Sequence, residues 1–323
     1  MKTFVTGGAG YIGSVCVEEL LNAGHHVTVF DNLSEGHRSA VDQRARFIQG
    51  CLSNPAEISL ALQASGAEAV LHFAAHALVG ESMENPAKYF RNNVAYGVHL
   101  LEACAAAGVR KFVFSSTCAT YGTPDRVPID ETLPQNPINP YGESKLLYER
   151  MLPWFHSIHG LEFVGFRYFN AAGATQRLGE HHRVETHLIP NILRVPLGQA
   201  KHAQILGADY PTPDGTCIRD FIHVLDLADA HIRALQPGIS GFFNLGNGEG
   251  YSVRQVIDAC RRVSGHPIPS VEKPRRPGDP PRLIASPSKA RSALGWSPRF
   301  AEIDPIVRSA WEWHQRNPDG YPD

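Results

Sequence analysis

The chain reads TFVTGGAGYIG from Thr3 to Gly13, a β-branched run that passes through three evenly spaced glycines into a helical pattern. Gly7, Gly10 and Gly13 have the spacing G-x-x-G-x-x-G. Backbone amides at such a turn can approach a pyrophosphate, and the N-terminus of the following helix favours its negative charge. A glycine-rich turn without a ligand is the alternative. The strand before the motif and the helix after it favour a dinucleotide site.

The first half of the chain alternates short β-branched or aromatic runs with longer amphipathic segments, which is typical of parallel β-α-β units. The expected strands are Thr3–Thr6, His26–Phe30, Arg46–Gln49, Ala69–Phe73, Lys111–Ser115 and Leu161–Tyr168. The expected helices are Tyr11–Ala23, Pro55–Ala64, Pro86–Ala107 and Tyr141–His159. Six strands with helices between them predict an α/β fold with a Rossmann-type doubly wound parallel sheet.

A second, smaller mixed α/β lobe is expected after Asn170, where the periodicity loosens and Gly, Pro and His become frequent. Its expected helices are Leu188–Leu197, Leu225–Leu235, Ser252–Ser264 and Ile303–Arg316, and the Pro- and Arg-rich stretch Lys273–Arg282 is expected to be a loop. We therefore predict a dinucleotide-binding domain over residues 1–170, joined by parts of 219–250, and a substrate-binding lobe over residues 171–323.

The composition excludes several classes of partner. The chain has 323 residues, and 30 Lys+Arg against 32 Asp+Glu leave a net charge of −2. Neither a nucleic acid nor an anionic membrane is therefore an expected partner. Six cysteines without a C-x-x-C pair, the lack of a long apolar run and the polar start of the chain predict a cytoplasmic protein with reduced thiols.

An acidic residue closes the second expected strand. Asp31 stands 18 residues after Gly13, near the spacing at which an acid hydrogen-bonds the adenosine ribose of a dinucleotide. A carboxylate at this place repels a 2′-phosphate. NAD is therefore favoured over NADP.

A tyrosine and a lysine stand four residues apart in YGESK, from Tyr141 to Lys145. On a helix both side chains share one face, and we expect the ammonium to lower the pKa of the phenol so that it can act as a base. An ordinary surface pair is the alternative. Thr117 favours catalysis because it ends the fifth expected strand, over the cofactor crevice, where its hydroxyl can bond the same substrate oxygen.

Taken together, the glycine motif, Asp31, Thr117, Tyr141 and Lys145 resemble the extended short-chain dehydrogenase/reductase family. Within it the chain is similar to the UDP-glucose 4-epimerase group along nearly its whole length, in eight segments: HFAAHALVGES (72–82), NNVAYG (92–97), SSTCATYG (115–122), NPYGESK (139–145), RYFNAAGA (167–174), ETHLIP (185–190), RDFIHVLDLADAH (219–231) and RRPGDP (275–280). The resemblance implies NAD-dependent interconversion of UDP-glucose and UDP-galactose through a 4-keto intermediate. It further implies a tightly bound, recycled NAD, and a homodimer formed through 86–107 and 141–159.

The same resemblance implies the roles of individual residues. Thr117 and Tyr141 would act at the C4 hydroxyl of the sugar, and Lys145 would contact the nicotinamide ribose. NAD would be bound by Gly7, Gly10, Tyr11, Ile12, Gly13, Asp31, Asn32, Leu52, Phe73, Ala74, Ala75, Asn93, Ser115, Tyr141, Lys145 and Tyr168. The UDP-sugar would be bound by Thr117, Asn170, His187, Leu188, Arg219, Arg276, Asp279 and Leu283, with Leu283 facing C2 of the sugar.

Three positions depart from the family pattern. Cys51 stands where an acid usually contacts adenine, Ala77 stands where some relatives carry a lysine, and Thr117 replaces the serine of many relatives. The resemblance therefore implies one weaker adenine contact and one absent charge near the cofactor, while the hydroxyl of residue 117 is kept.

Other polar residues are weaker candidates. The adjacent His181 and His182 lack the spacing of metal ligands, no carboxylate or cysteine pattern completes a site, and no metal is expected. His187 is either a nucleotide contact or a solvent-facing helix cap. Arg275 and Arg276 are either a solvated pair or a diphosphate grip.

Alternative functions remain at this stage. Another UDP-sugar 4-epimerase, acting on UDP-N-acetylglucosamine or a UDP-pentose, stays open. A 4,6-dehydratase needs an acid–base pair beside the hydroxyl residue, and Cys118-Ala119 offers neither. A non-catalytic NAD-sensing module would be expected to lack Tyr141 or Lys145, and both are present.

Overall fold

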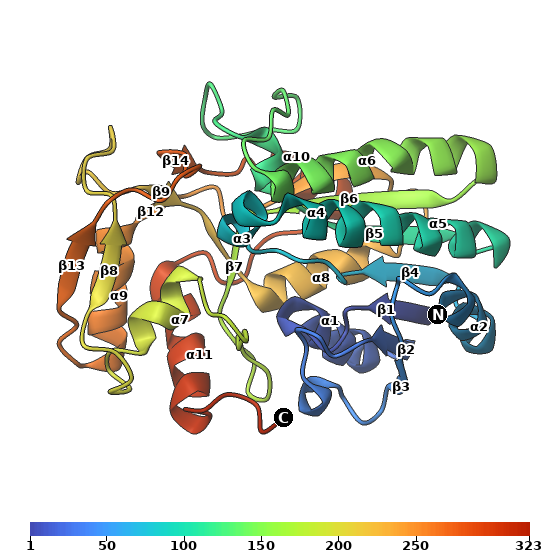
Figure 1. Ribbon diagram of the computed structural model, residues 1–323, viewed down its shortest axis with the longest axis horizontal. Helices are drawn as coiled ribbons and strands as arrows, with labels where there is room; N and C mark the ends of the chain where they lie inside the picture. The colour runs from blue at the N-terminus through green and yellow to red at the C-terminus, as the bar shows by residue number, and fades with distance from the viewer.

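Seven parallel strands form the central sheet of the computed structural model, which describes residues 1–323 (Figure 1). They are β1 (Lys2–Thr6), β2 (His26–Asp31), β3 (Arg46–Gln49), β4 (Ala69–His72), β5 (Lys111–Thr117), β6 (Glu162–Tyr168) and β11 (Gly241–Leu245), in the order β11-β6-β5-β4-β1-β2-β3. The order reverses between β1 and β4. The carboxyl ends of these two strands therefore border the crevice in which doubly wound sheets bind ligands.

Helices cover both faces of this sheet. One face is covered by α1 (Tyr11–Asn22), α8 (Val224–Ala234) and α10 (Ser288–Leu294), and the other by α2 (Pro55–Ser65), α5 (Tyr96–Ala106) and α6 (Pro140–His159). Neighbouring residues of β1 serve opposite faces: Val5 packs with the first group of helices and Phe4 with the second. This is why the strands are apolar throughout rather than alternating.

The sheet has seven strands where the sequence predicted six. The additional strand, β11, pairs with β6 in parallel and comes from within residues 219–250. The helix α10 was also not expected, and it packs in the same core as α1 and α8. Both elements are short, and their partners lie far away in the sequence, so local periodicity carries little signal for them.

The second lobe has a core of its own. Its elements are β8 (Ala203–Leu206), β9 (Ile218–Arg219), β12 (Tyr251–Ser252), β13 (Ser270–Lys273), β14 (Arg282–Leu283), α7 (Leu188–Leu193), α9 (Val253–Ser264) and α11 (Ile303–Arg316). Ile192, Val256 and Trp311 are buried together there, and Trp313 is also buried. The expected helix Leu188–Leu197 ends early, at Leu193, before Pro196. The loop expected from the Pro- and Arg-rich stretch spans residues 274–281.

The helix expected over Pro86–Ala107 is divided. It consists of α4 (Pro86–Tyr89), the π-helical turn η2 (Phe90–Ala95) and α5, and it follows α3 (Val79–Glu84), which was not expected. The wider turn places Asn93 so that its amide bonds both the N–H and the carbonyl of His76. A π-helical turn of this kind is frequent beside functional sites. The remaining short elements are η1 (Arg38–Ala40), η3 (Cys118–Tyr121), β7 (Asn170–Ala172) and β10 (Phe221–His223).

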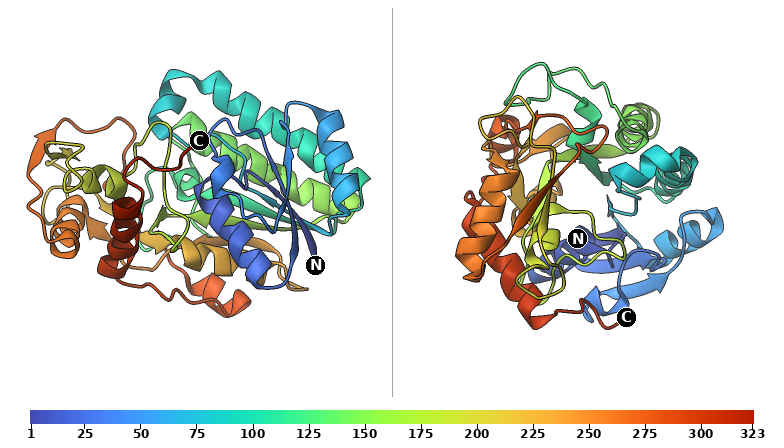
Figure 2. Two further views of the ribbon diagram at one scale, coloured as in Figure 1. Left: turned by 90° about the horizontal axis from the view of Figure 1, so that it is seen from below. Right: turned by 60° about the vertical axis from the view of Figure 1, so that its left-hand side comes forward.

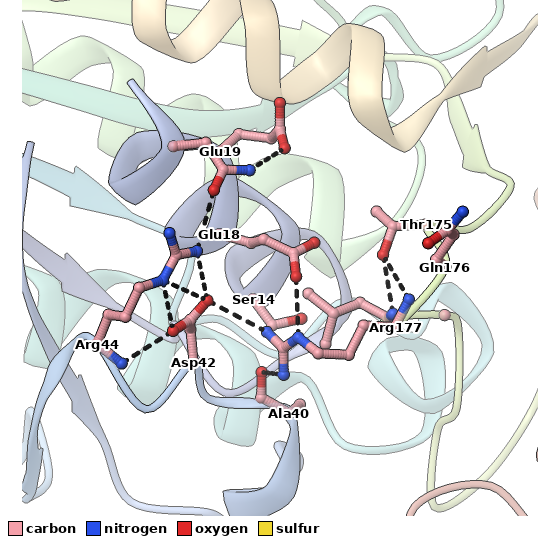
Figure 3. A network of polar contacts seen from close by, with 12 residues as sticks. Ser14, Glu18, Glu19, Ala40, Asp42, Arg44, Thr175, Gln176 and Arg177 are labelled. Atoms are coloured by element: carbon pink, nitrogen blue, oxygen red, sulfur yellow. Dashed lines mark hydrogen bonds and ion pairs between the residues drawn. The ribbon is translucent and has the colours of Figure 1, made fainter. Parts of the chain in front are cut away.

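The two lobes lie side by side, as the further views show (Figure 2). An ionic network joins them on one side (Figure 3). Arg177, which follows β7, donates from Nε to Glu18 of α1 at 2.8 Å and from Nη1 to the carbonyl of Ala40 at 3.4 Å. The loop that leads into the second lobe is therefore attached to the first.

A buried ion pair holds α6 against the sheet. Arg167 of β6 donates from Nη2 to Glu149 of α6 at 2.7 Å, and both side chains are almost fully buried. Glu149 also accepts hydrogen bonds from Ser116 and from Gln135. Such a pair is costly to break because the remaining charge is left buried.

We expect Arg167→Met to lower the free energy of unfolding by about 3–5 kcal/mol, because Glu149 then loses its counter-charge in the core. Urea denaturation measures the change. Arg110→Met is the matched control: it breaks the exposed pair with Glu68, and it should cost less than about 1 kcal/mol. Equal losses in both variants would contradict the role of the buried pair.

Candidate functional site

The glycine turn after β1 brings the backbone of three segments into close contact. A Cβ added at Gly7, where φ is +74°, would lie 2.5 Å from the amide nitrogen of Ala74, and one at Gly13 would lie 2.1 Å from the carbonyl of Gly7. At Gly10, which begins α1 without a side-chain cap, a Cβ would meet only the Gly7 oxygen, at 3.5 Å. The first-turn amides of α1 thus have no side-chain cap, and this fits the pyrophosphate of a dinucleotide.

Asp31 is held beside this turn at the end of β2. Its buried carboxylate accepts hydrogen bonds from the amides of Ala9 (3.0 Å) and Leu33 (2.8 Å). Each carboxylate oxygen can accept a further bond, as a ribose hydroxyl would require. The glycine turn and Asp31 together fit NAD.

Cys51 and Asn32 meet at the place where the family pattern has an acid. Asn32 donates to Cys51 Sγ at 3.6 Å. Partial burial raises the pKa of this thiol, but hydrogen bonds from Ser53 and Asn32 outweigh it and lower the pKa overall. A polar sulfur with a bound amide therefore stands at this position in place of the carboxylate.

The other predicted cofactor residues lie at the carboxyl ends of the strands. Phe73, Ala74 and Ala75 follow β4, Ser115 lies near the end of β5, and Tyr168 ends β6. Their roles toward NAD remain predictions.

Two of the predicted cofactor residues have structural contacts of their own. Leu52 is buried in the core with Phe30 and Ile58. Asn93 bonds His76, Asn92 and Ser144 with its amide group, so both its donors and both its acceptor positions are occupied. Asn93 thus fixes the loop after β4.

The predicted catalytic groups converge at the end of β5. Thr117 is the last residue of β5, and Tyr141 and Lys145 lie in the first two turns of α6, whose start is capped by Asn139. The Thr117 side chain lies close enough to the phenol of Tyr141 to act on its pKa. Lys145 Nζ donates to the carbonyl of Ser115 at 2.8 Å. The structure therefore brings the hydroxyl, the phenol and the ammonium together.

Burial controls the protonation of this group. It raises the pKa of Tyr141 to about 12, although Thr117 lowers it in part. It lowers the pKa of Lys145 to about 7, and the carboxylate of Glu149 opposes this shift. The expectation that the pKa of Tyr141 is lowered is therefore wrong for the chain alone, because burial raises it and Lys145 is not among the groups that act on it.

Glu149 was not identified from the sequence. It follows Lys145 by four residues on α6, a spacing that signals an ion-pair partner on the same helix face. Its carboxylate supports the charge of Lys145 without exposure to solvent.

Four of the predicted UDP-sugar residues lie on β9, on β14 and on the loop between β13 and β14, namely Arg219, Arg276, Asp279 and Leu283. Arg219 of β9 lies 3.5 Å from Asp279, and Arg276 belongs to the same loop. Arg275 instead pairs with Asp209 at 2.7 Å and covers the ring of Tyr210. Both side chains of this ion pair are exposed, so Arg275 agrees with the solvated alternative, and a contact with a diphosphate stays a prediction.

Leu283 connects this group with the catalytic end. It pairs with Arg219 in the sheet register, and its buried side chain packs with Cys118, the neighbour of Thr117, and with Phe169. Asn170, at the start of β7, donates its amide to the carbonyl of Asp220 at 2.9 Å. Leu283 thus packs against the residue that follows Thr117.

Tyr210 was missed from the sequence. Its buried hydroxyl has no hydrogen-bond partner, and it lies close to Asp279 and Arg219, whose charges act on its pKa. A buried hydroxyl of this kind usually has a partner, so a bound ligand is the natural acceptor.

His187 occupies the N-cap position of α7, as the cap alternative predicted, but its side chain makes no capping hydrogen bond. Its Nδ1 lies 2.7 Å from Glu180 and 3.4 Å from Glu185. Burial lowers the pKa of His187, but the carboxylates reverse this and raise it to about 10. Leu188 is the first residue of α7.

The sequence indicated no carboxylate pattern that completes a site with the histidines of this segment. In the structure Glu180 and Glu185 lie beside His182 and His187.

None of the helices combines the length and the apolar composition needed to cross a membrane.

Comparisons with known proteins match the whole chain. A family model described as the NAD dependent epimerase/dehydratase family matches residues 3–246. The UDP-glucose 4-epimerase of Lacticaseibacillus casei is 50% identical over 329 residues, which cover 100% of this chain and 99% of that protein. A crystal structure of a UDP-glucose 4-epimerase superposes with a TM-score of 0.96 at 49% identity and covers 99% of both chains.

A further solved structure carries ligands. The UDP-glucose 4-epimerase from Bifidobacterium longum, in complex with NAD⁺ and UDP, superposes with a TM-score of 0.95 at 38% identity and covers 99% of this chain and 100% of that one. The fold and the order of the elements are therefore shared along the full length.

The purified protein is expected to carry bound NAD with little NADP and to turn over without added nucleotide, because Asp31 repels a 2′-phosphate. In Asp31→Asn, which keeps the shape and removes the charge, the preference for NAD over NADP should fall by about 10-fold, or about 1.4 kcal/mol. Release of the nucleotide by denaturation followed by chromatography measures both. An empty protein with full activity, or a variant with unchanged preference, would contradict the assignment.

Proposed function

The chain belongs to the NAD dependent epimerase/dehydratase family, and on this basis we propose that it interconverts UDP-glucose and UDP-galactose by epimerisation at C4. Its cofactor is NAD, and the reaction is an isomerisation without net oxidation. One observation carries the proposal: in a chain similar to UDP-glucose 4-epimerases along its full length, Thr117, Tyr141 and Lys145 meet at the carboxyl edge of the sheet beside the glycine turn.

In this proposal Tyr141 is the acid–base group. Thr117 holds the C4 oxygen while Tyr141 takes its proton, and NAD, when bound, accepts a hydride from C4 and returns it to the opposite face of the 4-keto sugar. Burial raises the pKa of Tyr141 to about 12, so the base needs a positive charge nearby. In the chain alone Lys145 does not act on the phenol, and we propose that Lys145, whose charge Glu149 supports, supplies the positive charge once NAD and substrate are bound. Tyr141 then returns the proton to C4–O.

Binding of the UDP group explains how both faces of the 4-keto sugar can be presented to the nicotinamide. Arg219 and Arg276 both act on the pKa of Cys217, as Asp279 does, so both supply positive charge in this region. If the UDP remains bound there, the 4-keto sugar can turn over without leaving the protein. Guanidinium groups suit this task because they bind a diphosphate with two parallel hydrogen bonds.

A dehydratase is disfavoured by the surroundings of Thr117. Burial raises the pKa of Cys118 to about 12, and Ala119 carries no ionisable group. Neither can serve as the second acid or base that the elimination of water requires.

Oligomeric state and location stay proposals. We propose a homodimer through α5 and α6, because Trp154 and Ile158 of α6 are 68% and 69% exposed on one side of that helix. A cytoplasmic location agrees with six cysteines that are all free thiols.

Tyr141→Phe keeps the ring and removes the ionisable group. We expect kcat to fall by about 10²–10⁴, with little change in UDP-sugar affinity, as for the loss of a general acid–base group. A coupled assay with UDP-galactose and calorimetry with UDP measure the two quantities. Tyr251→Phe, a tyrosine of β12 outside the site, is the control and should keep its activity. A Tyr141→Phe protein whose kcat stays within a few-fold of that of the parent would show that another residue is the base.

Leu283 predicts the tolerance for the C2 substituent. The resemblance implies that a tyrosine at this position leaves room for only a hydroxyl on C2 of the sugar. Leucine lacks the outer ring atoms of tyrosine, so UDP-N-acetylglucosamine should be a second substrate, slower than UDP-glucose. In Leu283→Tyr we expect kcat/KM for the acetylated substrate to fall by about 10–200-fold while that for UDP-glucose changes little.

Chromatography of the products from both substrates, in the parent and the variant, makes this comparison. Leu283 is proposed to limit the space around C2 of the sugar because it packs beside Cys118. Equal losses on both substrates would instead make it a plain structural residue, and a parent without acetylated turnover would reject the tolerance.

A further inference from the structure

Four potential metal ligands gather in the segment between β7 and α7, which crosses between the two lobes in Figure 1. They are Glu180, His182, Glu185 and His187, and one ligand atom from each lies within 4.8 Å of all the others. The pattern E-x-H-x-x-E-x-H lies in irregular backbone, so no helical spacing indicates it in the sequence.

The distances between these ligand atoms match a four-coordinate ion. His187 Nδ1 lies 2.7 Å from Glu180 Oε1 and 3.4 Å from Glu185 Oε1, and His182 Nε2 lies 3.2 Å from Glu180 Oε1. Ligands at about 2.0–2.1 Å from a tetrahedral zinc ion lie about 3.3 Å apart. Small movements of side chains would therefore place all four atoms around one ion.

The ligands are oriented by the surrounding structure. The amide of His187 donates to Glu185 Oε1 at 2.7 Å, and Asn191 donates to the carbonyls of both residues. The ring of His182 packs edge-on against Tyr11 of α1. Contacts of this kind behind the ligands fix their direction, as in known metal centres.

The site is also accessible from one side. The side chain of Glu180 is 6% exposed, whereas that of His187 is 44% exposed. A buried carboxylate with two imidazoles and an open face can take up an ion from solvent without unfolding of the loop.

We propose that Glu180, His182, Glu185 and His187 bind one divalent transition-metal ion, with Zn²⁺ as the best chemical match. Two imidazoles and two carboxylates suit zinc, whereas Mg²⁺ and Ca²⁺ prefer oxygen ligands alone. The ion would fix residues 180–187 next to α1 and to the start of α7. The inference rests on the geometry of this segment, which shares only His187 with the predicted UDP-sugar site, and the ligand variants below therefore leave His187 unchanged.

The test uses the purified full chain after treatment with a chelator. Zn²⁺ is titrated by calorimetry and against a fluorescent indicator, and Co²⁺ is titrated by visible absorption. We expect one ion per chain with a Kd of about 1 µM or tighter. We also expect the strong visible bands of four-coordinate Co²⁺, without a thiolate charge-transfer band.

Two variants remove single ligands, His182→Ala and Glu180→Gln, and each should weaken Zn²⁺ binding by about 10- to 100-fold or more. His181→Ala is the control in the same loop, because His181 stacks on His37 and Tyr321 instead and should leave the Kd unchanged. Circular dichroism checks that the variants are folded. The Co²⁺ spectrum of the unaltered protein does not depend on them.

Three results would overturn the proposal. One is the lack of saturable Zn²⁺ binding tighter than about 100 µM in the unaltered protein. Another is binding that both ligand variants leave unchanged. The third is a thiolate charge-transfer band, which would place the ion on a cysteine such as Cys51. None of these results bears on the epimerase activity, which is measured separately.

Discussion

The close approach of Gly7 to Ala74 sets the geometry on which the site depends. A Cβ at Gly7 would lie 2.5 Å from the amide nitrogen of Ala74. The segment that follows β1 can therefore pass this close to the segment that follows β4 only if residue 7 lacks a side chain. The crevice between the two strands opens at that point, and α1 begins there with bare amides. Asp31 reaches the same place because β2 neighbours β1, and its bond to Ala9 ties it to the turn.

A second constraint is the buried charge behind the catalytic group. Glu149 joins α6 to the sheet through Arg167 and Ser116, and it also supports the charge of Lys145. The same carboxylate therefore contributes to stability and to the electrostatics of the site. Since the site is buried, each charge acts strongly, and the phenol of Tyr141 stays protonated without positive charge nearby.

The second lobe is joined to the first by another buried carboxylate. Asp220 accepts hydrogen bonds from the amides of Asn247, Gly248 and Ala285, which follow β11 and β14. Burial raises the pKa of Asp220 to about 6, although these amides lower it in part. This contact places Arg219 and Leu283 next to each other. The proposed contacts with the UDP group and with the sugar are therefore held in position by the same buried carboxylate.

The sequence by itself determined the elements whose signals are local. The strands of the first half begin and end within two residues of their expected positions, because β-branched runs bounded by glycines and helix caps act over short distances. The glycine motif and the residues predicted to be catalytic were also identifiable as candidates, since each lies at a strand end or a helix start. Only the tertiary structure showed the seventh strand, β11, because its partner β6 is remote in the chain. Only the tertiary structure likewise showed that Glu180, His182, Glu185 and His187 lie together, because their segment has no periodicity. It also decided the protonation of Tyr141 and Lys145, because the loss of hydration depends on how residues distant in sequence pack around a group, and no local pattern records that packing.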